Sequence, residues 1–256
     1  MRKNVILFAT HIMNEEVLRR FRLIQASVDE ETDIYILYHK HRGEVPLPVE
    51  NAKYYFFTTQ SLKKMGYTPI EKTLIPGSNH FPLLKFYKEF PDYEYYWNIE
   101  YDVCFSGDWQ YMFNTCASTD ADLITSHIER YIKDPRWYWW HTLELKDMII
   151  SMNEFWKSFN PIYRISKRAL SVLDSTLAKR NIGHHEALIP TVLNYYGMTI
   201  KDFVDIPEGD SQGLYKPACQ SENQFHAGSM RFRPPIEESE MIDRNILYHP
   251  VKLNFI

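Results

Sequence analysis

The hydrophobic pattern divides the chain into short apolar runs that alternate with amphipathic segments. Residues 5–9 form an uninterrupted apolar run, which is typical of a strand buried on both faces. Residues 15–28 place apolar side chains at helical spacing after Asn14, a favourable N-cap residue. Two more strands are expected at residues 33–38 and 54–58. This strand, helix, strand order predicts an α/β fold with a mostly parallel sheet and a ligand site at the carboxyl ends of its strands.

The same pattern continues through most of the chain. Further helices are expected at residues 61–65, 80–90, 107–115, 166–180 and 183–197, and further strands at 121–126 and 160–165. Residues 129–143 interrupt the rhythm, and a loop of this length in a compact domain is more often functional than idle. Residues 208–240 are polar and rich in Gly, Pro and Ser. We expect one domain over residues 1–256.

The stretch from residue 93 to 109 carries the strongest chemical signal. An aromatic and β-branched strand ends there in two carboxylates, Glu100 and Asp102, at positions i and i+2. On a strand this spacing puts both carboxylates on one face, where they repel each other. A divalent cation with oxygen ligands, Mg²⁺ or Mn²⁺, would neutralise them. The alternative is a solvated strand end whose acids face water.

Composition narrows the classes of partner. The net charge is −4 with no polybasic run, so nucleic-acid binding is not expected. No window has the 18 apolar residues of a membrane helix, so any membrane contact is expected to be peripheral. The three cysteines are Cys104, Cys116 and Cys219, without C-x-x-C spacing, which indicates neither a disulfide framework nor a zinc site. The first apolar run is too short for a signal peptide, and a reducing, cytoplasmic location is expected.

The motif strand is part of a wider resemblance. The pattern Trp-x-x-Glu-x-Asp-Val, followed by Gly-x-Trp, lies at residues 97–109, and further similar segments are residues 1–9, 162–170, 183–197 and 248–252. In these segments the chain resembles GT-A-fold glycosyltransferases of the nucleotide-diphospho-sugar transferase superfamily, and more narrowly a poorly characterised glycosyltransferase-like group. Such enzymes carry an Asp-x-Asp motif, for which this chain has Glu100-Tyr101-Asp102. The resemblance implies a GT-A-like, Rossmann-like α/β/α sandwich, with a nucleotide-sugar-binding half at residues 1–128 and an acceptor half at 129–256.

The resemblance also implies a donor site. Asp102 would bind the divalent ion, Mn²⁺ or Mg²⁺, that bridges the two phosphates of a nucleoside-diphosphate sugar. Glu100 would complete the metal shell or lie near the donor, and His249 matches a third ligand near the carboxyl terminus. Lys252 would offset the charge on the leaving diphosphate. Thr10 and His11 would lie near the nucleotide base, and Asn79 and Lys85 beside the motif strand. For these last four residues an ordinary capping or surface role is the alternative.

Glu186 matches the helix-opening acid that serves as the catalytic base in inverting members of the family. It would take the proton from the acceptor hydroxyl as that hydroxyl attacks the anomeric carbon. In a retaining enzyme it would only hold the acceptor, and an acid in the first turn of a helix also simply complements the helix dipole. A zinc site at His184, His185 and Glu186 is not expected, because adjacent side chains on a helix point about 100° apart.

We therefore expect a metal-dependent glycosyltransferase that moves a sugar from a nucleoside-diphosphate sugar to an acceptor hydroxyl. The acceptor is expected to be a saccharide, since Trp137, Trp139 and Trp140 offer ring faces for stacking, although packing is an equal alternative. Residues 129–143 and 212–233 would form the acceptor side. A sugar nucleotidyltransferase is the first rival, but the segment after residue 9 lacks its Gly-rich basic loop. A non-catalytic saccharide- or nucleotide-binding protein on the same fold is the second.

Overall fold

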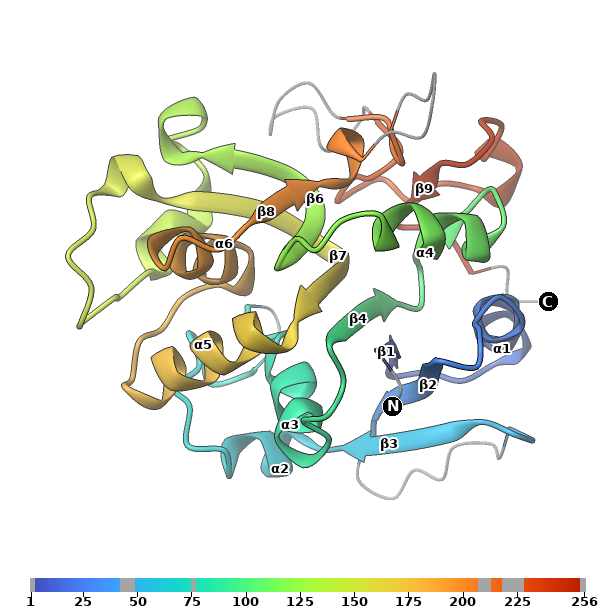
Figure 1. Ribbon diagram of the computed structural model, residues 1–256, viewed down its shortest axis with the longest axis horizontal. Helices are drawn as coiled ribbons and strands as arrows, with labels where there is room; N and C mark the ends of the chain where they lie inside the picture. The colour runs from blue at the N-terminus through green and yellow to red at the C-terminus, as the bar shows by residue number, and fades with distance from the viewer. Residues whose placement is uncertain (1–2, 42–48, 75–76, 207–212, 218–227, 254–256) are drawn as a thin grey trace.

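A central sheet with helices on both faces organises the chain (Figure 1). The computed structural model describes residues 3–41, 49–74, 77–206, 213–217 and 228–253. Its strands are β1 (Asn4–Thr10), β2 (Thr32–His39), β3 (Lys53–Phe57), β4 (Tyr95–Glu100), β5 (Cys104–Phe105), β6 (Leu123–Arg130), β7 (Trp156–Ser166), β8 (Ile200–Asp202) and β9 (Leu247–Tyr248). Its α-helices are α1 (Glu15–Ala26), α2 (Thr59–Lys63), α3 (Phe81–Glu89), α4 (Trp109–Ala117), α5 (Lys167–Ala178) and α6 (His185–Tyr195). Short 3-10 turns are η1 (Tyr131–Lys133), η2 (Tyr138–Thr142), η3 (Met152–Glu154), η4 (Phe203–Asp205) and η6 (Glu238–Glu240).

The main sheet has the strand order β3-β2-β1-β4-β7-β6-β8. Strands β3, β2, β1 and β4 are parallel neighbours, and β8 is parallel to β6. Strand β7 runs antiparallel to both β4 and β6. Because β1 is flanked by β2 on one side and β4 on the other, the strand order reverses there, and ligands in such sheets bind at the carboxyl ends near the reversal.

Alternating side chains of the buried strands build one core on each face of the sheet. In β1, Val5 and Leu7 join the core beneath α3, α5 and α6, whereas Ile6 and Phe8 join the core beneath α1 and α4. These four residues are at most 1% exposed. The expected α/β/α sandwich with a mostly parallel sheet is confirmed.

The N-cap residues of helices α1 and α5 are those that the sequence predicts. The Asn14 side chain accepts a hydrogen bond from the Val17 amide at 2.9 Å, and the Ser166 hydroxyl accepts one from the Ala169 amide at 3.1 Å. The start of α6 differs from the prediction. It begins at His185, and His184 is the N-cap residue with an extended backbone (ψ 133°).

Strand β7 is longer than predicted and its direction matters for the site. The sequence predicts a strand at residues 160–165, and the strand observed spans Trp156–Ser166. Its antiparallel pairing sets Ile162 opposite Ile99, so the first half of β7 extends past the end of β4. Residues from this half therefore flank the motif acids.

Other expectations concern cysteines and membranes. Cys104 and Cys116 are free thiols, and Cys219 lies outside the described residues, as do residues 212 and 218–227 of the expected acceptor segment. Among the described helices, none combines the length and the apolar character needed to cross a membrane.

Candidate functional site

The two motif acids lie at the carboxyl end of β4, as the sequence predicts. Glu100 is the last residue of the strand, and Asp102 follows in the turn before β5. The pairing of β4 with β1 sets Glu100 opposite Ala9, one residue before the end of β1. The acids therefore occupy the edge of the sheet where its strand order reverses.

A second small sheet brings His249 to these acids. Strand β5 pairs antiparallel with β9, with Cys104 opposite Tyr248, and the Val251 amide donates a hydrogen bond to the Asp102 carbonyl at 2.8 Å. His249 Nε2 then lies 3.7 Å from Asp102 Oδ1 and 4.0 Å from Glu100 Oε2. Side chains from two distant parts of the chain thus form one cluster.

The hydrogen bonds of His249 leave the nitrogen nearest the acids free to bind a cation. His249 Nδ1 lies 2.9 Å from the Arg231 carbonyl, which only accepts hydrogen bonds, so Nδ1 carries the proton. Burial lowers the pKa of His249, so the ring is neutral at pH 7 and Nε2 presents a lone pair to Asp102 and Glu100. A backbone carbonyl that fixes a histidine in this way is the usual support of a metal ligand.

The cluster fits a divalent cation. Two ligand atoms that are each about 2.1 Å from one ion can lie up to about 4.2 Å apart, and both distances from His249 Nε2 fall within that limit. All three ligand atoms lie within 4.8 Å of one another. Asp102 Oδ1 is buried and has no hydrogen-bond partner among the described residues. Two carboxylates and one imidazole are suitable ligands for Mn²⁺ or Mg²⁺.

A buried arginine fastens the two segments that meet at the cluster. Arg20, on α1, is 3% exposed and donates hydrogen bonds to the carbonyls of Tyr101, Val251 and Lys252, at 3.3, 3.1 and 2.8 Å. Glu16 balances its charge, with a nitrogen to oxygen distance of 2.9 Å. Arg20 therefore couples the motif turn to the carboxyl-terminal segment that carries His249.

The electrostatics of the cluster also favour a cation. Burial raises the pKa of Glu100 well above its usual value, and the charges of Asp102 and Glu186 raise it further. A hydrogen bond from Asn79 acts in the opposite direction. An ion beside Glu100 would relieve both the burial cost and the repulsion between the acids.

Glu186 lies in the first turn of α6, within electrostatic reach of Glu100. Its side chain is 15% exposed, and burial raises its pKa to about 7. The Asn160 amide, 3.4 Å from Glu186 Oε1, and the charge of Lys157 both hold the pKa lower than burial alone would. A carboxylate with a pKa near neutrality is suited to accepting a proton from a substrate.

The aromatic segment at residues 131–142 packs against the start of α6. The His184 amide donates a hydrogen bond to the Thr142 hydroxyl at 2.9 Å, and the Trp139 ring stacks on the His184 ring with centroids 4.4 Å apart. Trp140 is 4% exposed and belongs to a core cluster with Phe155, so it serves packing. Trp139 is only partly buried and stays accessible beside the helix that carries Glu186.

The remaining predicted residues have local partners. Thr10 closes a turn with both backbone groups of Ile12, and the exposed His11 ring packs edge-on against Tyr101, 5.3 Å away between centroids. Lys85 contacts Tyr55 and Glu89, and Lys252 Nζ lies 2.7 Å from Glu237. His11 and Asn79 therefore adjoin the cluster, whereas the two lysine ammonium groups are engaged elsewhere.

Sequence reasoning missed Arg20 and Asn160. Arg20 left a signal, because it lies within the apolar stripe formed by Val17, Phe21 and Ile24. Asn160 carried none, since its contact with Glu186 depends on the direction of β7.

Comparison with known proteins gives one family and several structures. Residues 36–122, which include Glu100 and Asp102, match the model of a family described as "Protein of unknown function (DUF3405)". No curated protein matches the sequence.

Similar solved structures include three transferases or synthases. One is a 4-diphosphocytidyl-2C-methyl-D-erythritol synthase from Anaerococcus prevotii, with 8% identity over 83% of this chain and 91% of that chain and a TM-score of 0.47. Another is the inositol-1-phosphate CTP transferase from T. maritima, with 10% identity over 79% and 84% of the two chains and a TM-score of 0.44. The third is the galactosyltransferase LgtC, with 12% identity over 77% and 72% and a TM-score of 0.40.

Proposed function

We propose that the protein is a metal-dependent glycosyltransferase that uses a nucleoside-diphosphate sugar. The observation that carries the proposal is the cluster of Glu100, Asp102 and His249 at the carboxyl end of β4, with Glu186 in electrostatic reach. A metal cluster next to a carboxylate of near-neutral pKa combines a place for a diphosphate with a base for an acceptor hydroxyl. On this proposal residues 1–128 form the donor half and residues 129–256 the acceptor half.

The donor side consists of groups at the ends of β1 and β4, together with His249 after β9. Asp102, Glu100 and His249 would hold the divalent cation, which would supply positive charge to stabilise a leaving diphosphate. His249 keeps Nε2 unprotonated because its Nδ1 proton is held by the Arg231 carbonyl. Arg20 keeps Asp102 and His249 at a fixed separation through its three carbonyl contacts. His11, exposed at the end of β1, is available to the nucleoside.

The acceptor side lies at the start of α6. Glu186 takes the proton of the acceptor hydroxyl, and the Asn160 amide and the Lys157 charge stabilise its ionised form. The partly buried Trp139 provides an aromatic face next to this helix start, which favours a saccharide acceptor because rings stack on the apolar faces of sugars. The acceptor hydroxyl and the donor would meet between Glu186 and Glu100.

Nucleotide binding tests the proposal first. We would measure the thermal shift of the protein with UDP, GDP and CDP, each with and without Mn²⁺. A ligand at a hundredfold excess over its dissociation constant stabilises the native state by about 2.7 kcal/mol, so even a weak donor nucleotide is detectable. We expect stabilisation by one nucleotide only when Mn²⁺ is present. No response to any of the three would contradict the proposal.

The role of Glu186 is tested with the sugar conjugate of the nucleotide that responds. The Glu186→Gln variant should bind this donor as the wild type does, yet lose about 100-fold or more in transfer rate, because Gln cannot accept the proton. Glu30→Gln, which changes an exposed carboxylate in the turn before β2, is the matched control. Full transfer by the Glu186 variant would remove Glu186 from this role.

A further inference from the structure

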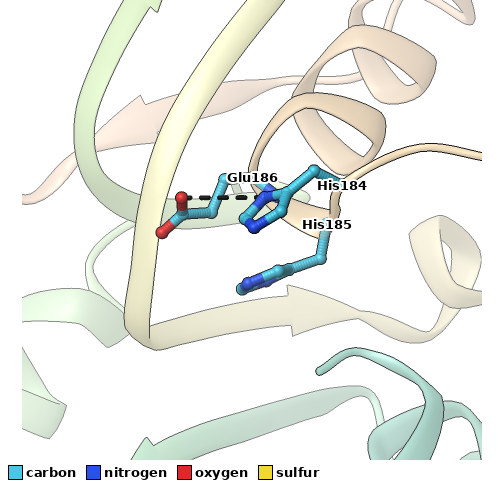
Figure 2. Close-up of side chains that lie close together, drawn as sticks. All are labelled: His184, His185 and Glu186. Atoms are coloured by element: carbon cyan, nitrogen blue, oxygen red, sulfur yellow. Dashed lines mark hydrogen bonds and ion pairs between the residues drawn. The ribbon is translucent and has the colours of Figure 1, made fainter. Parts of the chain in front are cut away.

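Three histidine side chains surround the start of α6, and none of them belongs to the cluster of Glu100, Asp102 and His249. The His184 and His185 rings lie with centroids 4.8 Å apart, and the His80 ring stacks 6.3 Å from His185. All three side chains are buried, with 1%, 4% and 6% of His80, His184 and His185 exposed. Figure 2 shows the His184 and His185 rings and the Glu186 carboxylate extending from the start of the helix toward the same side.

His184 lies outside helix α6, so helical spacing does not set the direction of its side chain. His184 precedes the helix as its N-cap, so its side chain does not follow the 100° step between adjacent helical residues. As a result, one ligand atom each from His184, His185 and Glu186 lies within 4.8 Å of the other two. His184 Nδ1 and Glu186 Oε2 are 3.7 Å apart, which two ligands of one ion can satisfy.

Several nitrogen atoms of these histidines lack the partners that buried polar atoms normally have. Nδ1 of His185 and both ring nitrogens of His80 are buried, and within the described part of the chain none of them has a hydrogen-bond partner. A buried polar group that stays unpaired keeps the full cost of its removal from water. A ligand that accepts imidazole lone pairs would offset this cost at His185.

The lone pair of His184 Nδ1 has the Glu186 amide as its hydrogen-bond donor, at 3.3 Å, so this nitrogen carries no proton. A cation would take the place of that amide as the partner of Nδ1, with Glu186 Oε2 3.7 Å away on the same side. A lone pair beside a carboxylate is stabilised by a positive charge placed between them.

We propose that His184, His185 and Glu186 form a second metal site, selective for Zn²⁺, at the amino-terminal end of α6. Two imidazoles and one carboxylate are a ligand set typical of zinc sites that keep an open position. Imidazole nitrogen favours zinc over Mg²⁺ and Mn²⁺, which suit the two carboxylates and single histidine of the first cluster. The second site should therefore prefer Zn²⁺ over Mn²⁺ more strongly than the first does.

Occupation of this site has a consequence that rests on the proposed function. A Glu186 carboxylate bound to Zn²⁺ cannot accept the proton of an acceptor hydroxyl. Zn²⁺ should then inhibit transfer in enzyme saturated with Mn²⁺, and the donor should still bind.

Zinc binding by itself decides the proposal. Protein freed of metal by chelation would be titrated with Zn²⁺ in a calorimeter, and with Co²⁺ as a spectroscopic substitute whose visible absorption reports nitrogen ligands. Asp102→Asn removes a ligand of the first cluster only. His184→Asn removes a ligand of the second but retains a good N-cap residue, and Glu186→Gln preserves the size of the side chain. His141→Gln changes an exposed histidine of the neighbouring turn and is the control.

We expect one Zn²⁺ site that persists in Asp102→Asn and His141→Gln and is weakened by at least about 100-fold in His184→Asn and Glu186→Gln. The estimate is a lower bound, since changing only an outer partner of a metal ligand costs about 10- to 100-fold. Unchanged zinc affinity in both second-site variants, or loss of all zinc binding in Asp102→Asn, would overturn the proposal. Failure to detect transfer with any donor would contradict the proposed function and leave this binding result standing.

Discussion

Replacing Glu186 by Gln should change the pH dependence of stability. The difference in the free energy of unfolding between the variant and the wild type should shift in favour of the variant as the pH rises. The wild-type carboxyl has its pKa raised by burial from 4.5 to about 7. The folded state therefore holds this proton more tightly than the unfolded state does. The free energy of unfolding must then fall as the pH rises from about 4.5 to 7 and remain lower above that range. Gln does not titrate, so this decrease in the free energy of unfolding is absent from the variant.

The size of the effect follows from the shift. At 1.36 kcal/mol per pH unit, a rise from 4.5 to about 7 corresponds to about 3 kcal/mol, of which about 2–3 kcal/mol is expressed between pH 5 and pH 8. Glu100 adds to the effect in the same direction, because the Glu186 charge raises the pKa of Glu100 and the variant lacks that charge.

Urea unfolding at pH 5 and pH 8, in the presence of a chelator, measures this directly. A chelator is needed because a bound cation would favour the ionised carboxylates. We expect the stability difference between Glu186→Gln and the wild type to shift by about 2–3 kcal/mol in favour of the variant between the two pH values. The exposed control Glu30→Gln should follow the wild type. Parallel stability profiles for the wild type and Glu186→Gln would refute the account of a buried, charge-sensitive Glu186.

Two further substitutions test the supports of the site. Arg20→Met should destabilise the fold by about 3–5 kcal/mol and weaken Mn²⁺ binding, since it leaves three buried carbonyls without their donor and removes one of the two arginines that contact Glu16. Arg19→Met, at an exposed neighbour, should cost about 1 kcal/mol or less, and equal effects of the two in chemical unfolding would contradict this. Trp139→Ala should raise the KM for the acceptor about 10-fold with unchanged donor affinity in steady-state kinetics, and an unchanged KM would exclude stacking by this ring.

The fold could be predicted because its central strands are buried on both faces. Residues 5–9 are a continuous apolar run and the strand before Glu100 is mostly aromatic, and neither has the helical periodicity of α1 and α5. The direction of β7 was beyond this reasoning. An interior strand has the same apolar pattern whether it runs parallel or antiparallel to its neighbours.

The candidate site was predictable only in its local parts. Glu100 and Asp102 share a strand end, so their spacing indicates a common position, but the approach of His249 depends on a pairing of two short strands, β5 and β9. That approach was predicted through family resemblance alone. Lys85 and Lys252 were proposed from their nearness to the site in sequence. In the structure Lys85 pairs with Glu89, one helical turn away, and Lys252 pairs with Glu237 on a neighbouring segment.

The histidines near Glu186 illustrate a different difficulty. Whether His184 lies inside the helix or caps it changes the direction of its side chain, and helix boundaries are uncertain by one or two residues when only the sequence is considered. The backbone of His184 removes the helical-spacing reason for not expecting a metal site here.

Asp102 is proposed to help bind a divalent cation that in turn binds a nucleoside diphosphate. The measurement is a calorimetric titration with the nucleotide that stabilises the wild type, with and without Mn²⁺. It compares Asp102→Asn with Asp92→Asn, which changes an exposed acid in the turn before β4. We expect Mn²⁺-dependent binding by the wild type and by Asp92→Asn, and its loss in Asp102→Asn. Equal affinity in Asp102→Asn, or binding that is indifferent to Mn²⁺ in the wild type, would exclude this role of Asp102.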